Sequence, residues 1–259
     1  LKFAGVVMPA DAARHLALLL WMVGSTGIYV MGLAVLFRKF RHADIKFEQA
    51  HFGWFIPPVS KLLIPVPGYE LAGLFPQHAE LLVGLSTASL GIGLFLFIFV
   101  GATVFQRYIF GGPLPVKLSP SFFVGIAPPA IIAVALFKLV HLCGHHNVFG
   151  LDVEVMGPLF RFAMLTNWGL AAWWFLMAVF LVLVPLVRRQ IPFAMSWWAL
   201  TFPTGALAVA SGATHAATGI TFVGSFYHAV AFLLLVIWLV VFTRTVIGVA
   251  TRRIFLPAH

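Results

Sequence analysis

Seven long apolar stretches alternate with short polar stretches along the sequence. Most of them exceed the roughly 20 residues that a helix needs to cross a bilayer core. Backbone N–H and C=O groups in lipid must be satisfied within the protein, so each stretch is expected to form a helix. The pattern predicts an all-α polytopic membrane protein. Its predicted spans cover about residues 15–37, 52–74, 79–106, 120–143, 157–187, 193–217 and 225–251.

The second, fourth and sixth stretches each contain proline within apolar or aromatic sequence. These interruptions recur at nearly equal spacing, and a straight apolar stretch follows each one, as in a repeated pair of helices. Proline in a helix removes a backbone hydrogen bond, so such helices belong inside a bundle rather than in contact with lipid. The sequence therefore predicts repeated helical hairpins with proline-kinked inner helices around a pore. The interruptions are Trp54-Phe55-Ile56-Pro57-Pro58, Phe122-Phe123-Val124-Gly125-Ile126-Ala127-Pro128-Pro129 and Trp197-Trp198-Ala199-Leu200-Thr201-Phe202-Pro203.

Basic residues follow the first, third, fifth and seventh spans, whereas the intervening loops around 75–78, 144–156 and 218–224 contain no Lys or Arg. Basic loops stay in the cytoplasm during membrane insertion. The sequence thus predicts an integral protein of a bacterial inner membrane, with a cytoplasmic C-terminus and with residues 1–14 outside. The basic residues are Arg38, Lys39, Arg41, Lys46, Arg107, Lys117, Arg188, Arg189, Arg252 and Arg253.

The composition excludes a soluble domain, because 62% of the residues are hydrophobic, 9% are charged and the mean hydropathy is +1.04. The net charge of +9 arises mainly in the basic loops, and no RNA-binding motif accompanies it, so nucleic acid is not a predicted partner. No linker divides the chain, which is expected to form one transmembrane domain over residues 1–259. The single Cys143 excludes an intrachain disulfide.

Enzyme signatures are missing from the sequence. It has no HExxH pair, no GxSxG elbow, no P-loop and no pair of carboxylates within a span, so the protein is not predicted to be an enzyme. Lys61, Lys138 and Arg161 are the ionisable candidates inside the predicted spans, and all three are cationic, whereas the seven acidic residues fall in loops or near span ends. A positive interior suits anions, although such long side chains also extend to a headgroup layer or pair with an acidic residue at a span end.

Histidines leave a different class of function open. Two imidazoles four positions apart fall on one helix face and suggest a metal site, although Gly144 weakens the helix there. That site would draw on His141, His145 and His146, with Asp152 and Glu154 as further ligands. Histidines on successive spans would ligate a haem in an electron-transfer protein, and the candidates are His51, His215 and His228. Lone membrane histidines more often bond neighbouring helices, so no metal or cofactor is predicted.

Small residues recur after Pro203. Gly205, Gly212 and Gly219 are seven positions apart, and alanines such as Ala206 and Ala213 lie between them. Small residues permit close helix packing, and they also leave room for a pore. Packing is the preferred interpretation.

Three segments carry a resemblance to a known family: Gly53-Trp54-Phe55-Ile56-Pro57-Pro58-Val59, Ile126-Ala127-Pro128-Pro129-Ala130 and the tryptophan-rich segment that ends in Phe202-Pro203. They resemble the tellurite-resistance/dicarboxylate transporter family, which is TehA-like and includes the slow-type anion channels. The resemblance implies a homotrimer in which each protomer has its own pore, built from ten helices in five hairpins. With seven spans of a probable ten, the chain would lack three N-terminal helices, and spans two, four and six would be inner.

The resemblance implies an anion channel that passes small monovalent anions through the bilayer and is gated by Phe202. An apolar pore without a strong binding site favours anions that lose their water easily. A secondary carrier for malate or other C4-dicarboxylates, or a tellurite-resistance permease, remains an alternative, with small inorganic anions or dicarboxylates as the partners. The further pore-lining candidates are Phe55, Pro57, Pro58, Phe123, Pro128, Pro129, Lys138, Trp198, Thr201 and Pro203.

Overall fold

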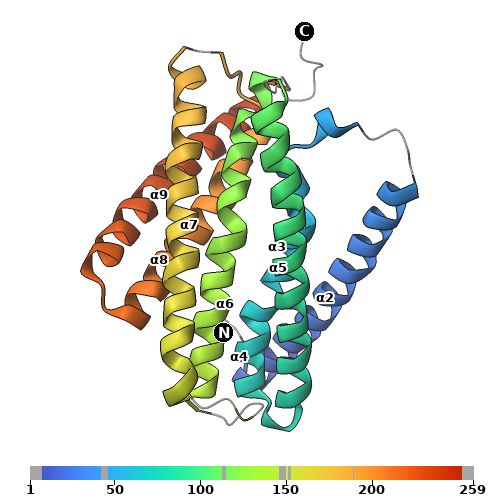
Figure 1. Ribbon diagram of the computed structural model, residues 1–259, viewed down its shortest axis with the longest axis vertical. Coiled ribbons are helices and arrows are strands. Elements are labelled where there is room, and N and C mark those ends of the chain that lie inside the picture. The colour runs from blue at the N-terminus through green and yellow to red at the C-terminus, as the bar shows by residue number, and fades with distance from the viewer. Residues whose placement is uncertain are drawn as a thin grey trace.

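Helices make up the regular structure of the chain, and the described residues contain no strand. The computed structural model describes residues 8–41, 46–112, 115–145, 150, 153–188 and 190–252. The prediction of an all-α polytopic membrane protein is confirmed. The α-helices are α2 (Ala10–Arg41), α3 (Ile56–Leu63), α4 (Pro65–Leu74), α5 (Ala79–Phe110), α6 (Ala127–Cys143), α7 (Val153–Val187), α8 (Thr201–Thr218) and α9 (Thr221–Ala250) (Figure 1).

Five helical stretches of the described chain are long and apolar enough to cross a membrane, rather than the seven predicted. They are Ala10–Arg41, Pro76–Phe110, Leu118–Cys143, Val153–Val187 and Thr221–Ala250. The two other predicted spans fold as shorter pieces. Residues 52–74 form a 3₁₀ turn followed by α3 and α4, and residues 193–217 form a 3₁₀ turn followed by α8.

The prolines of the inner segments act at helix starts. Each segment begins as a 3₁₀-helix, namely η2 (Phe52–Phe55), η4 (Val116–Ile126) and η5 (Met195–Leu200), and then continues as α3, α6 or α8. Pro57, Pro128 and Pro203 lie in the first turn of the α-helix that follows, where a missing N–H removes no helical hydrogen bond. The predicted kinks thus take the form of 3₁₀-to-α junctions.

A second break separates α3 from α4 at Ile64. Pro65 and Pro67 follow it, and neither has an N–H to donate to the preceding turn. The carbonyl of Ile64 compensates in part, because it accepts hydrogen bonds from the N–H of Gly68 at 3.2 Å and from Trp21 Nε1 of α2 at 2.9 Å. This buried hydrogen bond attaches α2 to the break.

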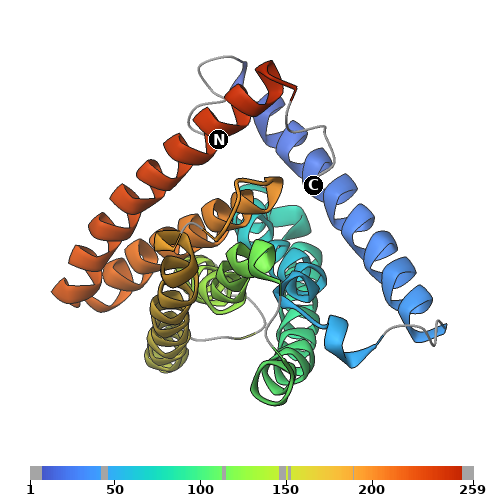
Figure 2. The same ribbon diagram turned by 90° about the horizontal axis from the view of Figure 1, so that it is seen from above.

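The helices form an inner and an outer group. Of the most apolar window of Leu118–Cys143, which contains α6, 72% is buried, compared with 6% in α2 and 11% in α9. Helix α6 contacts α3, α4, α5, α7 and α8, and α2 and α9 lie at the periphery (Figure 2). The proline-containing segments are therefore the inner ones, in agreement with the prediction.

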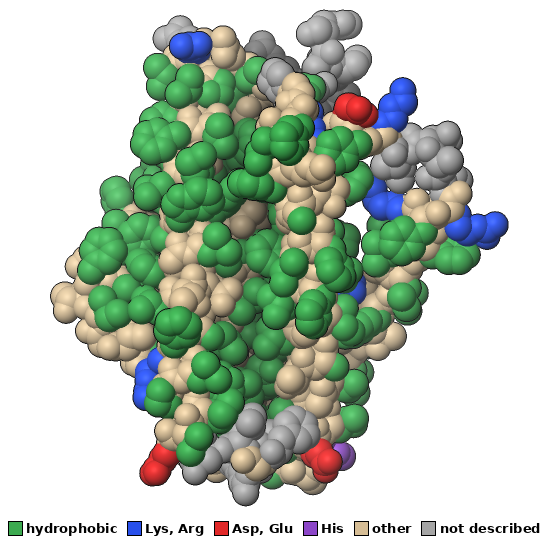
Figure 3. All heavy atoms as spheres, viewed as in Figure 1, with side chains coloured by type: hydrophobic (Ala, Val, Ile, Leu, Met, Phe, Trp, Pro, Cys, Tyr) green, Lys and Arg blue, Asp and Glu red, His purple; other side chains and the backbone are tan. Residues whose placement is uncertain are grey.

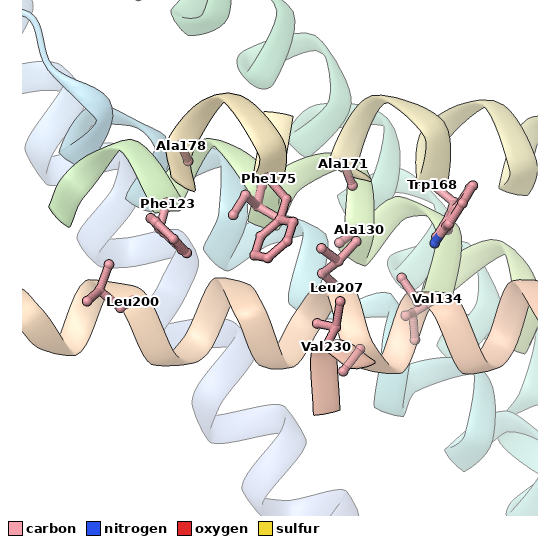
Figure 4. Close-up of a cluster of buried hydrophobic side chains, with 14 of the residues drawn as sticks. Phe123, Ala130, Val134, Trp168, Ala171, Phe175, Ala178, Leu200, Leu207 and Val230 are labelled. Atoms are coloured by element: carbon pink, nitrogen blue, oxygen red, sulfur yellow. The ribbon is translucent and has the colours of Figure 1, made fainter. Parts of the chain in front are cut away.

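The core consists of three buried clusters that meet at Val66 of α4, which packs against all of them. The largest joins η4, α6, α7, α8 and α9. In it, Phe123 and Phe175 make an edge contact with their ring centroids 6.1 Å apart, beside Leu207 and Val230 (Figure 4). Apolar packing of this kind holds the inner helices α6 and α8 together.

The outer surface is apolar between its two ends. Figure 3 shows hydrophobic side chains over most of the visible face, with most of the charged side chains toward the ends. Successive spans run in opposite directions (Figure 1), so Arg41, Arg107, Arg188 and Arg252 come to the same end of the bundle. Arg189 and Arg253 lie outside the described residues. An apolar band between polar ends is the surface expected of a membrane protein.

Candidate functional site

One face of α8 is uncovered although the helix belongs to the inner group. Phe202 and Val209 are 48% and 57% exposed, and Ala216 is exposed between partly buried neighbours. Positions spaced alternately by four and three residues fall on one helix face. We call this face the α8 strip, and its residues are Phe202, Ala206, Val209, Ala213 and Ala216.

The glycines of α8 point elsewhere. A Cβ atom built on Gly205 would lie 3.6 Å from Leu234 Cδ2, and one on Gly212 would lie 3.5 Å from Tyr227 Cδ2, both on α9. The glycine face therefore packs on α9, which confirms the packing interpretation for these two positions. Ala206, Ala213 and Ala216 belong to the open face, whereas Ala208 and Ala210 are buried.

The α8 strip faces the side of the bundle where α3 lies. Ala206 packs against both the largest cluster and the cluster that contains Phe55, Val59 and Ile131. That cluster joins α3, α5 and α6. Ala206 of the strip thus lies where α8 meets the packing of α3 and α6. Phe202 lies one turn before it, at the start of the strip.

A second uncovered face runs along the α3–α4 segment. Leu63, Pro67 and Glu70 are exposed and follow the same spacing of four and three. Glu70 forms an ion pair with Lys138 of α6, and the exposed fractions of the two side chains are 50% and 29%. Glu70 thus places a negative charge on this face, and the positive charge of Lys138 on α6 compensates it.

The three inner helices are parallel. Each of α3, α6 and α8 begins at the basic end of the bundle and runs toward the opposite end (Figure 1). The first turn of a helix carries partial positive charge on its N–H groups. The inner group therefore presents three positive helix ends on the same side as the basic loops.

The segment before Phe202 is fixed by hydrogen bonds. Trp198 Nε1 donates to Thr245 Oγ1 of α9 at 3.1 Å, and Thr201 Oγ1 donates to the carbonyl of Trp198 at 2.8 Å. Pro203 is buried. Trp198, Thr201 and Pro203, all predicted to line the pore, thus hold the junction between η5 and α8 in place. Phe202 lies at this junction and is exposed.

The remaining predicted pore-lining residues pack between helices. Phe55 is 3% exposed and contacts Phe97 of α5 with ring centroids 5.6 Å apart, while Pro57 lines a groove beside α2. Buried in the bundle are Pro58, Phe123, Pro128 and Pro129. The structure therefore brings Phe202 and Lys138 to uncovered faces and places the others behind those faces.

Several residues of the uncovered faces were not predicted as site residues. Val209, Ala216 and Pro67 have no chemical signature in the sequence. Their signal is the alternating spacing of three and four positions from Phe202 or Glu70. This spacing becomes informative only when the buried face of each helix is known.

The histidines do not form a shared centre in the described residues. His51 Nδ1 accepts a hydrogen bond from the N–H of Gly53 at 3.0 Å, and His215 Nδ1 lies 2.9 Å from the carbonyl oxygen of Ile220. The rings of His141 and His145 contact each other at 4.8 Å. No group of three possible metal ligands occurs within the described ranges, and His146 and Asp152 lie outside them.

Apolar outer helices around a group of inner helices define a polytopic integral membrane protein. The family model described as voltage-dependent anion channel (SLAC1) matches residues 3–246. The chain belongs to this family, which confirms the resemblance drawn from the proline-containing segments.

Three relatives are transporters by name. The uncharacterized transporters MJ0762 and MJ0576 of Methanocaldococcus jannaschii are each 30% identical over 239 residues, which is 91% of this chain and 67% and 66% of their own lengths. The chain thus spans about two thirds of each. The malic acid transport protein of Schizosaccharomyces pombe is 23% identical over 181 residues, which is 68% of this chain and 41% of its own length. No solved structure matches the chain significantly.

Proposed function

We propose that the protein is an anion channel in which small monovalent anions pass along the α8 strip and the uncovered face of α4, and that Phe202 closes this path. The observation that carries the proposal is the exposure of Phe202 at the start of a strip otherwise made of alanine and valine. A bulky aromatic ring on an inner face of small side chains is suited to control hydration at a constriction.

The electrostatics of the inner helices favour weakly bound anions. Positive helix ends attract anions toward the basic side, while the walls of the α8 strip are apolar. Because Glu70 compensates the charge of Lys138, this lysine does not act as a strong fixed binding site. Weak binding lets an ion leave quickly, and apolar walls favour anions that dehydrate easily.

We infer that the conduit has further walls. The α8 strip is uncovered by the described residues, and an ion path through lipid requires protein on all sides. Additional N-terminal helices in a ten-helix protomer would supply them, and each protomer of a homotrimer would then contain one pore. The basic loops support a cytoplasmic C-terminus, and we propose that the protein lies in the inner membrane of a bacterial cell.

A coupled carrier for malate or a related dicarboxylate is the second candidate. The similarity to a malic acid transport protein favours it. A carrier that binds two carboxylates needs uncompensated cationic or hydrogen-bonding groups at its site. The pairing of Lys138 with Glu70 therefore supports the channel over the carrier.

Currents in planar bilayers test the two candidates. The complete protein and Phe202→Ala would be compared under gradients of chloride, nitrate and malate. We expect large ohmic anion currents that appear or grow in the variant, because a methyl group cannot occlude the path. Phe232→Ala is the matched control, since Phe232 is 70% exposed on the outer helix α9 and its loss should leave the currents unchanged.

Silence in a correctly assembled Phe202→Ala protein would contradict the gate. Saturating malate transport coupled to protons or to a counter-substrate, without ohmic currents, would instead identify a carrier.

A further inference from the structure

Lys61 is a buried cation without a hydrogen-bond partner. Its side chain is 4% exposed on the inner helix α3, and Nζ has no hydrogen-bond acceptor in the described structure. Burying an ammonium group in a membrane protein is costly unless a counter-charge or several acceptors compensate it. The structure lacks the expected compensation at this position.

The amine lies at the junction of α2, α3 and α5. Nζ lies against Gly32 of α2, at the place where a side chain on Gly32 would be. It is 5.9 Å from the centroid of the Tyr29 ring, and a ring face attracts a cation weakly. Gly32 thus leaves room for the ammonium group, and Tyr29 offers only partial compensation.

A hydroxyl pair lies beside this junction. Tyr29 Oη and Ser89 Oγ are 2.6 Å apart, and either atom is able to donate. Two hydroxyl groups that share one hydrogen bond keep one further hydrogen to donate. The junction therefore combines one charged donor with one neutral donor, which is a suitable pair for a small anion and an unsuitable one for a metal cation.

We propose that this junction binds a small monovalent anion such as chloride, between Lys61 Nζ and the Tyr29–Ser89 pair. The site uses other residues than the α8 strip and lies on the outward side of α3, so it is separate from the proposed conduit. The bound anion would neutralise Lys61 and attach α2 to α3 and α5.

Access to the site is available along α2. A groove of about 440 Å³ runs between α2 and α3 and reaches Gly32, and Gly27 and Ser60 also line it. Helix α2 is held lightly, because Ala13, Trp21 and Gly32 are its buried residues. A small separation of α2 from α3 would therefore admit an ion.

Thermal unfolding of the purified full chain in detergent tests the site, with sodium chloride compared with sodium gluconate at equal ionic strength. A ligand that binds the folded state stabilises it by RT ln(1 + L/Kd), where L is the free ligand concentration, so the melting temperature rises with the logarithm of the ligand concentration above Kd. We expect chloride at about five times its Kd to raise the melting temperature by about 2–4 °C. Lys61→Met should abolish this chloride-specific rise. Lys39→Met is the control that should retain it, since Lys39 Nζ lies over the ring of Trp54 at 4.3 Å, away from the junction.

A second pair of variants keeps the test decisive if Lys61→Met does not fold. The added methyl group of Gly32→Ala would displace the ammonium group and should raise the dissociation constant of chloride at least tenfold. Gly169→Ala, on α7 and away from the site, should leave this constant unchanged, because a Cβ there meets no atom within 4 Å. Equal melting temperatures of the wild type in chloride and gluconate would overturn the site, as would a full chloride response in both Lys61→Met and Gly32→Ala. These outcomes do not depend on whether the protein conducts current.

Discussion

The ammonium group of Lys138 on α6 forms an ion pair with the carboxylate of Glu70 on α4, and the pair joins two inner helices across 68 positions of sequence. Both side chains are partly exposed, so the pair contributes at most about 1 kcal/mol to stability. Its larger effect is on the electrostatic potential. The carboxylate of Glu70 compensates the charge of Lys138, which the sequence alone predicts to be a cation inside the protein.

Neutralising one partner of this pair should therefore change ion selectivity more than stability. Glu70→Gln leaves the charge of Lys138 uncompensated and is expected to raise the permeability of chloride over sodium at least twofold. Lys138→Gln should lower it. Reversal potentials under a sodium chloride gradient measure both effects, and identical reversal potentials in the two variants would show that the pair lies away from the ion path.

Gly93 of α5 should tolerate no side chain. A Cβ atom there would lie 2.7 Å from Leu62 Cγ and 3.0 Å from the backbone nitrogen of Leu62, so α3 would have to move. We expect Gly93→Ala to destabilise the protein by about 1–3 kcal/mol and to lower its melting temperature by several degrees. Gly91→Ala, two positions earlier on the same helix, meets nothing within 4 Å and should be neutral. Equal melting temperatures of the two variants would contradict the close approach of α3 to α5.

His51, which precedes η2, should make stability depend on pH. Burial lowers the pKa of its imidazole below the ordinary value of 6.5, and the nearby charge of Lys39 lowers it further. The folded state therefore favours the neutral ring, whose Nδ1 accepts the N–H of Gly53. Below about pH 6.5 the unfolded chain binds the proton more readily, so the free energy of unfolding falls as the pH falls through the folded-state pKa.

His51→Asn tests this expectation, because Asn is also a good N-cap acceptor but does not titrate. Melting temperatures recorded from pH 8 to pH 5 should separate the wild type from the variant only below about pH 6.5, with the wild type losing more stability. Parallel profiles over the whole range would show that His51 does not couple to folding.

The arrangement of inner and outer helices could be predicted because it depends on local chemistry. Proline is expensive in a lipid-facing helix, so Pro57, Pro128 and Pro203 identify the segments that other helices must cover. The form of the interruption could not be predicted in the same way. Whether proline bends a helix or begins one depends on the turn before it, and in all three segments that turn is a 3₁₀-helix.

The faces of the inner helices were harder to predict, because they depend on contacts between distant residues. Nothing near Phe55 in the sequence indicates that it turns toward Phe97 of α5, and nothing near Lys138 indicates its pairing with Glu70. Phe202 was found through the family resemblance. Phe202 is 48% exposed whereas Phe123 is 4% exposed, and this difference depends on how each helix is turned, as when α8 directs its glycines toward α9.

The parallel orientation of α3, α6 and α8 makes the two mouths of any path beside them chemically different. The starts of α3, α6 and α8 and the basic loops lie at one mouth, whereas the carbonyl-bearing ends of α4, α6 and α8 lie at the other (Figure 1). Equal salt on both sides of the membrane would not make these mouths equivalent, because the helix dipoles are fixed in the fold. The proposed path is therefore electrically asymmetric, and its current at +100 mV and at −100 mV should differ in size in symmetric chloride.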